Sequence, residues 1–289
     1  MKLSIIIVNW NSCNLTQKCI EKIQENVFNQ GVEIIVIDNA SDIFDEFKFK
    51  RHPYNVIIHK NKTNIGFGKA CNFGAQLAKG EFLLFLNPDV EINKDTLLKS
   101  ISIFESNERE LRLGALGIQL TDGDGVQKTC ATFPNTWNII CETLRLNKIN
   151  PFFFKGIRDE NFDHCSSQLV DHVIGAFYLI KKSLFEELKG FDPEYFVYYE
   201  DLDLSNRLKR TGKKILYTTK ISAKHIGGGS TKSLGYSRNY ISIDAKEVYV
   251  RKNIAPNCLF NIIIKLCFKV ERLLIKIFIK KNNRLRPSS

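Results

Sequence analysis

The stretch Glu81-Phe-Leu-Leu-Phe-Leu-Asn-Pro-Asp-Val-Glu91 decides the fold of this chain. Its unbroken apolar run, from Phe82 to Leu86, is short and predicts a strand that is buried on both faces of a sheet. Pro88 cannot donate to a sheet ladder, so we expect the strand to end there. Asp89 follows at the carboxyl end of the strand, where open α/β sheets bind their ligands. Taken alone, the stretch fits a metal or phosphate site and an ordinary Asp/Pro turn equally well.

Similar apolar runs recur along the first half of the chain, each followed by polar or glycine residues. The predicted strands are Leu3–Val8, Val32–Ile37 and Val56–His59, and the predicted helices begin near Asn14 and cover Lys69–Lys79. This strand–helix alternation predicts an α/β fold with a mostly parallel, Rossmann-like central sheet flanked by helices.

After about residue 112 the pattern changes from strand–helix alternation to hairpins. The run Leu113–Leu120, the Asp122-Gly-Asp-Gly125 turn and the run Val126–Thr132 predict a hairpin-like excursion. Farther on, Gln168–Ile180 predicts a long strand or a strand pair. Between these segments the chain is rich in aromatic residues and predicts no clear element.

The composition is that of a folded protein with an anionic partner. The chain has 289 residues, of which 44% are hydrophobic and 25% charged, and a formal net charge of +11. We expect one compact domain over residues 1–250 and a distinct tail over residues 251–289. The N-terminus lacks the pattern of a signal peptide, and every long apolar stretch is interrupted by Lys or Arg. Eight scattered cysteines suit a reducing, cytoplasmic compartment and make a zinc site improbable.

A second informative stretch is Tyr195-Phe-Val-Tyr-Tyr-Glu-Asp-Leu-Asp-Leu204, in which aromatic residues lead into three acids. It predicts a helix with Glu200, Asp201 and Asp203 in its first turn. Acids at a helix N-terminus are explained in part by the helix dipole alone. Burial beside tyrosines and repulsion between neighbouring carboxylates would also raise the pKa of at least one of them. A carboxyl group tuned in this way can act as a general base, and we favour that interpretation.

The third stretch is Lys224-His225-Ile-Gly-Gly-Gly-Ser-Thr231. Successive glycines let backbone N–H groups approach an anion, and His225 can bind a metal ion. Either signal alone is weak, because such glycine runs are more often flexible loops and single histidines more often structural. Their adjacency favours a site.

Together these stretches resemble the inverting glycosyltransferases of family 2, which have the GT-A fold, and more narrowly the bacterial rhamnosyltransferases that build polysaccharide chains. The segments that carry the resemblance occur in the family's order over about residues 3 to 250. They are Ser4–Asn11, Ile37–Ser41, Asn64–Asn72, Leu86–Asp89, Tyr199–Asp203 and His225–Ser230.

The resemblance implies a role for each motif residue. The nucleotide-sugar donor would be bound by Asn9, Asp38, Asn64, Asn72, Asn87 and Asp89. Asp201 would be the catalytic base beside Glu200, and Gly175, Ala176 and Asp203 would lie near the transferred sugar or the acceptor. Asp89 and His225 would hold Mg²⁺ or Mn²⁺. Asn87 stands where the family's Asp-x-Asp motif begins with Asp, so Asp89 alone supplies the negative charge of that motif.

The tail has its own pattern over Leu259–Lys281. Lys265, Lys269, Arg272, Lys276 and Lys280 recur at helical spacing, with Ile, Leu and Phe on the remaining faces. This predicts a basic amphipathic helix that lies on an anionic membrane surface. The alternative is a helix packed on the domain with a solvated basic face.

The function expected from the resemblance is transfer of a sugar, with L-rhamnose from dTDP-L-rhamnose as the favoured donor. The acceptor would be a lipid-linked saccharide of bacterial surface polysaccharide (O-antigen or capsule) synthesis, at the inner face of the cytoplasmic membrane. Alternative donors are a UDP-hexose or a galactofuranose donor. A nucleotidyltransferase is disfavoured because no glycine-rich, lysine-bearing N-terminal loop is present. A nucleic-acid-binding protein is disfavoured because the basic residues concentrate in the tail, so no nucleic-acid partner is expected.

Overall fold

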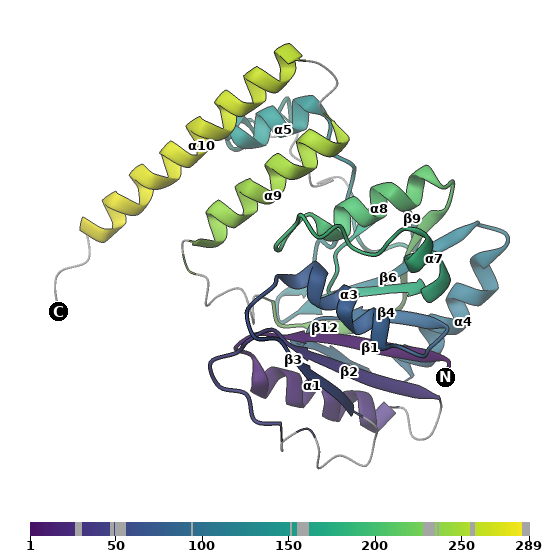
Figure 1. Cartoon of the computed structure of the whole chain (residues 1–289). Helices are drawn as coiled ribbons and strands as arrows, with labels where there is room; N and C mark the ends of the chain where they lie inside the picture. Colours follow the sequence, from purple (N-terminus) through teal and green to yellow (C-terminus); the bar gives the residue numbers. More distant parts are fainter. Residues whose placement is uncertain are drawn as a thin grey trace.

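A ten-stranded sheet forms the centre of the protein (Figure 1). The structure is a computed structural model, and it describes residues 1–26, 31–46, 49, 56–93, 95–150, 152–154, 162–227, 235, 237–254 and 258–284. Eight strands follow the order β3-β2-β1-β4-β11-β6-β12-β5, with β7 paired to β6 and β9 paired to β12. A small separate sheet joins β8 and β10.

The predicted strands and helices of the first half are confirmed. The strands are β1 (Leu3–Asn9), β2 (Val32–Asp38), β3 (Val56–Lys60), β4 (Phe82–Leu86), β5 (Val90–Ile92), β6 (Leu113–Asp122), β7 (Gly125–Val126), β8 (Cys130–Ala131), β9 (Gln168–Val170), β10 (His172–Val173), β11 (Phe177–Lys181) and β12 (Lys214–His225). The helices are α1 (Cys13–Asn26), α3 (Phe67–Leu77), α4 (Thr96–Glu108), α5 (Thr136–Thr143), α6 (Leu146–Ile149), α7 (Lys182–Glu187), α8 (Glu200–Arg210), α9 (Ser237–Asn253) and α10 (Cys258–Arg284).

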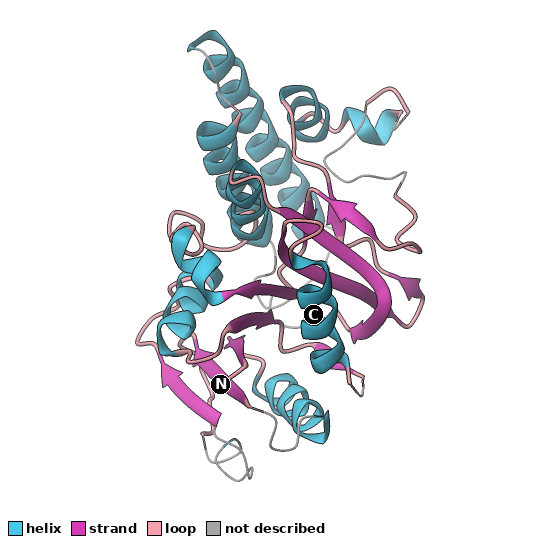
Figure 2. Cartoon of the chain, turned by 90° about the vertical axis from the view of Figure 1, so that its right-hand side faces the viewer, coloured by secondary structure: helices cyan, strands magenta, loops and turns pink. Residues whose placement is uncertain are grey.

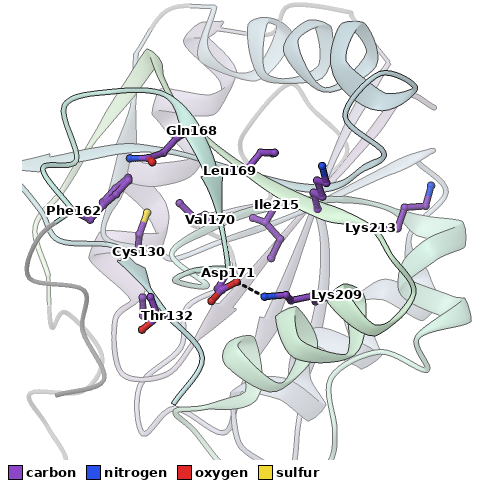
Figure 3. A pocket seen from close by; sticks show the side chains of 12 residues that line it. Cys130, Thr132, Phe162, Gln168, Leu169, Val170, Asp171, Lys209, Lys213 and Ile215 are labelled. Atoms are coloured by element: carbon purple, nitrogen blue, oxygen red, sulfur yellow. Dashed lines mark hydrogen bonds and ion pairs between the residues drawn. The ribbon is translucent and has the colours of Figure 1, made fainter. Parts of the chain in front are cut away.

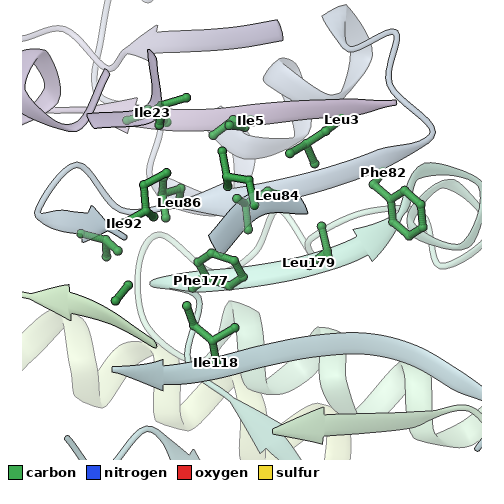
Figure 4. Packing of buried hydrophobic residues seen from close by; sticks show 14 of the residues in the cluster. Leu3, Ile5, Ile23, Phe82, Leu84, Leu86, Ile92, Ile118, Phe177 and Leu179 are labelled. Atoms are coloured by element: carbon green, nitrogen blue, oxygen red, sulfur yellow. The ribbon is translucent and has the colours of Figure 1, made fainter. Parts of the chain in front are cut away.

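The central strands are buried on both faces, as their unbroken apolar runs predict. In β4, Phe82, Leu84 and Leu86 belong to one core, while Leu83 and Phe85 belong to the core on the opposite face. Alternate residues of a strand point to opposite faces, so a continuous apolar run feeds both cores at once. The first core is closed by α1 and α4 (Figure 4), and the second by α3, α7 and α8.

The sheet is parallel in one half and mixed in the other. Strands β3, β2, β1 and β4 pair in parallel, as the strand–helix alternation predicts. Strand β11 then runs antiparallel to both of its neighbours, β4 and β6. In the same half of the sheet, β6 and β7 pair across the predicted Asp122–Gly125 turn.

Three helices form a unit of their own at one end of the sheet (Figures 1 and 2). Helix α10 lies beside α9 and contacts α5. Their shared core is built from Ile139 of α5, Ile243 and Val250 of α9, and Ile264, Phe268 and Ile275 of α10. The expected boundary at residues 250 and 251 therefore falls inside α9. Over the described residues, no helix has both the length and the apolar character that a membrane span requires.

A buried lysine holds this helical unit together. The Lys246 side chain is only 4% exposed, and its ammonium group lies 3.1 Å from Glu271 of α10 and 3.6 Å from Glu142 of α5. Burial raises the pKa of the Glu271 carboxyl, while the positive charge of Lys246 opposes that rise. A charge with these partners is costly to unpair, so Lys246 fixes the three helices relative to one another.

The start of α3 contacts the backbone of the segment that precedes α8. Gly66 has φ +87°, and a Cβ atom on it would lie 2.3 Å from the backbone oxygen of Phe196. Next to it, the N–H of Phe67 donates a hydrogen bond of 2.7 Å to the same oxygen. Only glycine allows this backbone conformation and this close approach together.

We expect Gly66→Ala to lower the free energy of unfolding by at least about 1–2 kcal/mol, the cost of a left-handed non-glycine residue, with the clash adding to it. Gly123→Ala is the matched control, because a Cβ atom there meets nothing within 4 Å. It should change stability by less than about 0.5 kcal/mol. Urea unfolding followed by circular dichroism measures both changes, and equal stability of the two variants would contradict the constraint at Gly66.

Candidate functional site

A cavity of about 480 Å³ opens at the carboxyl ends of β1 and β4, where the sheet meets the helical unit. It is bounded on the side of that unit by Glu142 of α5 and Ser242 of α9. The residues expected to form the site that line it are Asn64, Asn87, Asp89, Gly175, Ala176, Glu200 and Asp201. The structure therefore brings the opening stretch and the acidic stretch to one cavity.

Asp89 and His225 are brought together by the antiparallel pairing of β5 with β12. His225 is opposite Val90 in this ladder, and the N–H of Ile226 donates to the backbone oxygen of Asp89. The Nε2 atom of His225 lies 3.4 Å from Oδ1 of Asp89, and both side chains are nearly buried. Two adjacent ligands of one octahedral Mg²⁺ ion, each about 2.1 Å from it, are separated by about 3 Å.

The pair therefore fits two neighbouring positions of a divalent cation. Within the described part of the chain, no group of three or more His, Cys, Asp and Glu side chains is arranged to hold a metal ion. A cation held by Asp89 and His225 would need further oxygen ligands from a bound diphosphate or from water. Of the glycine run that follows, only Gly227 belongs to the described residues, and the predicted anion-binding loop beyond it lies outside them.

Asp201 is held by backbone groups in the wall of the cavity. Its Oδ2 atom accepts a hydrogen bond of 2.7 Å from the N–H of Gly175, and its Oδ1 atom accepts one of 2.8 Å from the N–H of Leu202. Ala176, next to Gly175, accepts a hydrogen bond of 3.0 Å from the N–H of Asn87. The carboxylate thus keeps a fixed direction at the cavity, and it is connected through two backbone steps to the end of β4.

Glu200 has a different environment, although it is the next residue along the chain. Its residue is 5% exposed, and among the described groups its buried Oε2 atom has no hydrogen-bond partner. Burial, and after it the negative charge of Asp201, raise the pKa of the Glu200 carboxyl well above its usual range. The expectation that burial and crowding raise at least one pKa is met here, at Glu200.

The backbone before these two acids is strained. Tyr198 and Tyr199 have φ values of 74° and 67°, so two consecutive non-glycine residues are in the left-handed region. Such residues are uncommon, and they persist where surrounding contacts hold them. Tyr199 packs on Tyr249 of α9, with ring centroids 5.6 Å apart. This contact lies at the turn from which α8 starts, with Glu200 and Asp201 as its first residues.

His172 is a site residue that the sequence did not single out. Its Nε2 atom lies 3.8 Å from Oδ2 of Asp201, and its Nδ1 atom lies 3.1 Å from Oγ of Ser205. Ser205 donates its own proton to the backbone oxygen of Asp201, so its Oγ is free to accept from Nδ1–H. Burial lowers the pKa of His172, against the charges of Asp201 and Asp171. A neutral imidazole with a bare Nε2 atom therefore stands beside the carboxylate.

Asn9 and Asp38 were expected to bind the donor, but their polar atoms form hydrogen bonds with each other and with nearby hydroxyl groups. The Asn9 amide donates to Asp38 at 2.7 Å, and the Asn9 oxygen accepts from Thr16 and Ser12. Asp38 also accepts from the backbone and side chain of Ser41. Neither residue is among the described residues that line the cavity. Their contact with a donor stays a prediction, and the structure shows them stabilising the loop ends of β1 and β2.

Asn64 does reach the cavity, and Asn39 positions it. The Oδ1 atom of Asn64 accepts from the Asn39 amide at 2.7 Å and from the N–H of Gly66 at 3.0 Å. A ligand would therefore meet the NH₂ group of Asn64. Asn39 lines the cavity as well, but the sequence offered no sign that it differs from the other loop asparagines.

Asn72 and Asp203 have structural contacts instead. Asn72 donates to the backbone oxygen of Phe191 and accepts from its N–H, at 2.7 and 2.8 Å. Asp203 forms a buried ion pair of 2.7 Å with Arg207 and accepts from Asn253 of α9. In the described wall of the cavity neither residue appears. Their roles toward donor and acceptor also stay predictions.

A second cavity of about 440 Å³ is lined by residues of β8 and β9 (Figure 3). Cys130 and Ala131 line both cavities. In the second one, Lys209 forms an ion pair of 2.7 Å with Asp171, beside Lys213 and the apolar residues Phe162 and Ile215. It holds no pair of carboxyl groups, of those the structure describes, to match Glu200 and Asp201. Of the two cavities, the first is therefore the one that contains the predicted catalytic residues.

Comparison with known proteins identifies the family. The profile described as Glycosyl transferase family 2 matches residues 4–189, which is more than half of the chain. The protein therefore belongs to glycosyl transferase family 2, and its class is that of the GT-A glycosyltransferases. The resemblance seen in the sequence motifs is confirmed.

Three curated relatives have informative names. A poly(ribitol-phosphate) beta-glucosyltransferase of Bacillus spizizenii is 32% identical over 45% of this chain, but the match spans only 21% of that enzyme. An N-acetylglucosaminyl-diphospho-decaprenol L-rhamnosyltransferase of Mycobacterium tuberculosis is 27% identical over 69% of this chain and 68% of its own. Rhamnosyltransferase WbbL of Escherichia coli is 27% identical over 79% of this chain and 85% of its own.

Solved structures confirm the fold. The Staphylococcus aureus enzyme TarS in complex with UDP-GlcNAc superimposes with a TM-score of 0.57 at 18% identity, over 93% of this chain and 70% of that one. A mannosyltransferase from Pyrobaculum calidifontis in complex with GDP-Man and Mn²⁺ gives 0.58 at 16% identity, over 88% and 66%. The GT-A architecture expected from the sequence is the architecture observed.

Exchange of each acid for its amide separates the roles of the two neighbours. We expect Asp201→Asn to fold and to lose about 10²–10⁴-fold in transfer rate, the usual contribution of a general base. Glu200→Gln should keep most of the rate, because a neutral amide resembles the protonated acid in shape and charge. Initial rates with matched thermal melts test both variants, and the opposite order of losses would make Glu200 the base.

Proposed function

We propose that this protein transfers a sugar from a nucleotide-sugar donor to a hydroxyl group of a lipid-linked saccharide, with inversion at the anomeric carbon. We further propose L-rhamnose from dTDP-L-rhamnose as the transferred sugar, in the synthesis of a bacterial surface polysaccharide such as O-antigen or capsule. The observation that carries the proposal is the carboxylate of Asp201, held by two backbone N–H groups in the same cavity as Asp89.

The choice of donor and acceptor is supported by the relatives that align over most of their length. Both the mycobacterial and the Escherichia coli proteins are named rhamnosyltransferases, and this chain spans more than two thirds of each. The mycobacterial name also specifies a saccharide carried on a diphospho-decaprenol lipid. The UDP-hexose alternative is supported by the Bacillus relative, which is more identical but over a much shorter segment.

In the proposed reaction, the acceptor hydroxyl enters the cavity beside Asp201. The carboxylate accepts the hydroxyl proton as the oxygen attacks the anomeric carbon, and the nucleoside diphosphate leaves from the opposite face. Gly175 and Leu202 keep the carboxylate oriented, and His172 offers a bare Nε2 atom with which the abstracted proton can be shared. Burial raises the pKa of Glu200 and so disfavours a second negative charge in the same wall.

Asp89 and His225 would hold Mg²⁺ or Mn²⁺, and the ion would supply positive charge to the departing diphosphate. The carboxylate of Asp89 suits such ions, with His225 as a further ligand and oxygen ligands from the diphosphate completing the set. Lys128, in the wall of the same cavity, provides a further positive charge from the chain itself.

We propose that the outer surface of α10 lies on the anionic inner face of the cytoplasmic membrane. A lipid-linked acceptor would be held in the same membrane, which would explain why α10 has an exposed apolar surface. Side chains at a spacing of three and four residues form one exposed apolar stripe. Its members are Ile262, Leu266, Val270, Leu273 and Ile277, each 43–55% exposed. Lys265, Lys269 and Lys276 are exposed beside this stripe, so charge and apolar surface favour the same partner.

Two of the five basic residues predicted to face the membrane, Arg272 and Lys280, are not among the exposed lysines beside the stripe. Arg272 pairs with Asp244 and Glu247 of α9, so it fastens the helix to its neighbour. The side chain of Lys280 lies outside the described residues. Helix α10 therefore has two apolar faces, one packed on α9 and one exposed, with lysines along one border.

A donor screen by calorimetry tests the proposed donor. We expect dTDP-L-rhamnose to bind more tightly than UDP-glucose, UDP-GlcNAc and a UDP-galactofuranose donor, and each affinity to rise when Mn²⁺ is added. Asp89→Ala should weaken donor binding and remove the effect of Mn²⁺, because half of the cation pair is lost. Tighter binding of a UDP-sugar than of dTDP-L-rhamnose would replace the proposed donor, and Mn²⁺ dependence that survives in Asp89→Ala would refute the metal role.

Sedimentation with vesicles tests the membrane surface. The intact protein should sediment with vesicles rich in phosphatidylglycerol, and less with neutral vesicles, because lysines border the stripe. A variant with Leu266→Gln, Leu273→Gln and Ile277→Gln should lose this binding. Ile43→Gln is the control, because Ile43 is 82% exposed elsewhere on the molecule. An intact protein that leaves vesicles unbound, or a dimer that the triple variant abolishes, would instead assign the stripe to protein contact.

A further inference from the structure

The amide of Gln127 occupies a position that the proposed reaction leaves unexplained. Gln127 follows β7 in the hairpin, and its N–H donates to the backbone oxygen of Leu120 at 2.8 Å. Its Oε1 atom lies 2.7 Å from Nδ1 of His225, and its Nε2 atom lies 2.8 Å from the backbone oxygen of the same histidine. Gln127 therefore forms hydrogen bonds with both the imidazole ring and the backbone oxygen of His225.

The orientation of this amide follows from its other neighbour. Nε2 of Gln127 also lies 3.1 Å from Oδ2 of Asp122. Hydrogen bonds from backbone N–H groups and from Gln127 itself lower the pKa of Asp122, so its carboxylate is ionised and can only accept. A flipped amide would set an oxygen against two oxygen acceptors. The NH₂ group must therefore face Asp122 and the backbone of His225, and the amide oxygen must face the imidazole.

An amide oxygen can only accept, so Nδ1 of His225 must carry the proton in the neutral ring. The lone pair is then on Nε2, the atom that faces Asp89 at 3.4 Å. Metal-bound histidines are commonly fixed in this way, with the second ring nitrogen donating to an acceptor that sets the tautomer and the ring direction.

We propose that Gln127 is a positioning residue that holds His225 in the Nδ1-protonated tautomer, ready to bind a divalent cation through Nε2. The proposal rests on the cation role of Asp89 and His225 given above. Gln127, next to the hairpin of β6 and β7, would thus set the tautomer of a histidine about a hundred residues away in the sequence.

The variant that tests the proposal is Gln127→Met, which keeps the length of the side chain and removes its hydrogen bonds. Gln119→Met is the matched control, because Gln119 is a half-buried glutamine on the adjacent strand β6 and donates to the backbone oxygen of His164. His225→Ala reports on the cation site itself. Thermal melts of the four proteins, wild type included, establish that each is folded.

The first readout is Mn²⁺ affinity, measured by electron paramagnetic resonance with and without dTDP. We expect Gln127→Met to weaken Mn²⁺ binding by about 10–100-fold, the usual effect of removing such an outer partner. Gln119→Met should leave the affinity unchanged. If His225→Ala binds Mn²⁺ as the wild type does, the cation role itself fails. If His225→Ala weakens binding and Gln127→Met does not, the cation role survives and the role of Gln127 is overturned.

The second readout is independent of any metal. In protein labelled with ¹⁵N at histidine, the His225 resonances can be assigned by their loss in His225→Ala. At alkaline pH, the metal-free wild type should show the Nδ1-protonated tautomer, and Gln127→Met should lose this preference. A wild-type His225 protonated on Nε2 would overturn the proposal whatever the Mn²⁺ affinities are.

Discussion

The antiparallel pairing of β11 with β4 is the constraint on which the cavity that joins Asp89 to Asp201 depends. Because β11 runs against β4, its first residues lie beside the last residues of β4, and the N–H of Asn87 bonds to the oxygen of Ala176. The preceding residue, Gly175, then presents its N–H to Asp201. A parallel β11 would begin at the opposite edge of the sheet. The reversed strand is therefore what joins the donor side of the cavity to the acidic helix.

Much of this arrangement could be predicted from the sequence, because the signals involved are local. The run Phe82–Leu86 specifies a strand buried on both faces, and Pro88 specifies where it ends. The ordered motifs predicted the fold and the meeting of Asp89 with Asp201 in one site. The crowding of Glu200 and Asp201 predicted a raised pKa for one of them. The strand and the raised pKa follow from the chemistry of adjacent residues, whereas the meeting of Asp89 with Asp201 follows from the resemblance that the ordered motifs carry.

The sequence could not show which polar side chains form hydrogen bonds with one another and which remain available to a ligand. Asn9 and Asp38 carry the expected donor-binding chemistry, yet they satisfy each other across two neighbouring strands. His172 gave no sequence signal, because its importance comes from its distance to Asp201. The tail was predicted as one amphipathic helix, but periodicity alone cannot show that its apolar residues divide into a packed face and an exposed face.

The shared core of α5, α9 and α10 has a consequence for how this enzyme could be shortened or recombined. Phe268 and Ile275 of the last helix pack against Ile139 of α5, and one turn farther along α5 Glu142 forms part of the cavity wall. The last helix is therefore no detachable anchor. An enzyme cut before α10, or given the tail of a relative, would lose the support of its own cavity along with its outer surface. Any exchange of tails between such enzymes must carry α5 and α9 with it.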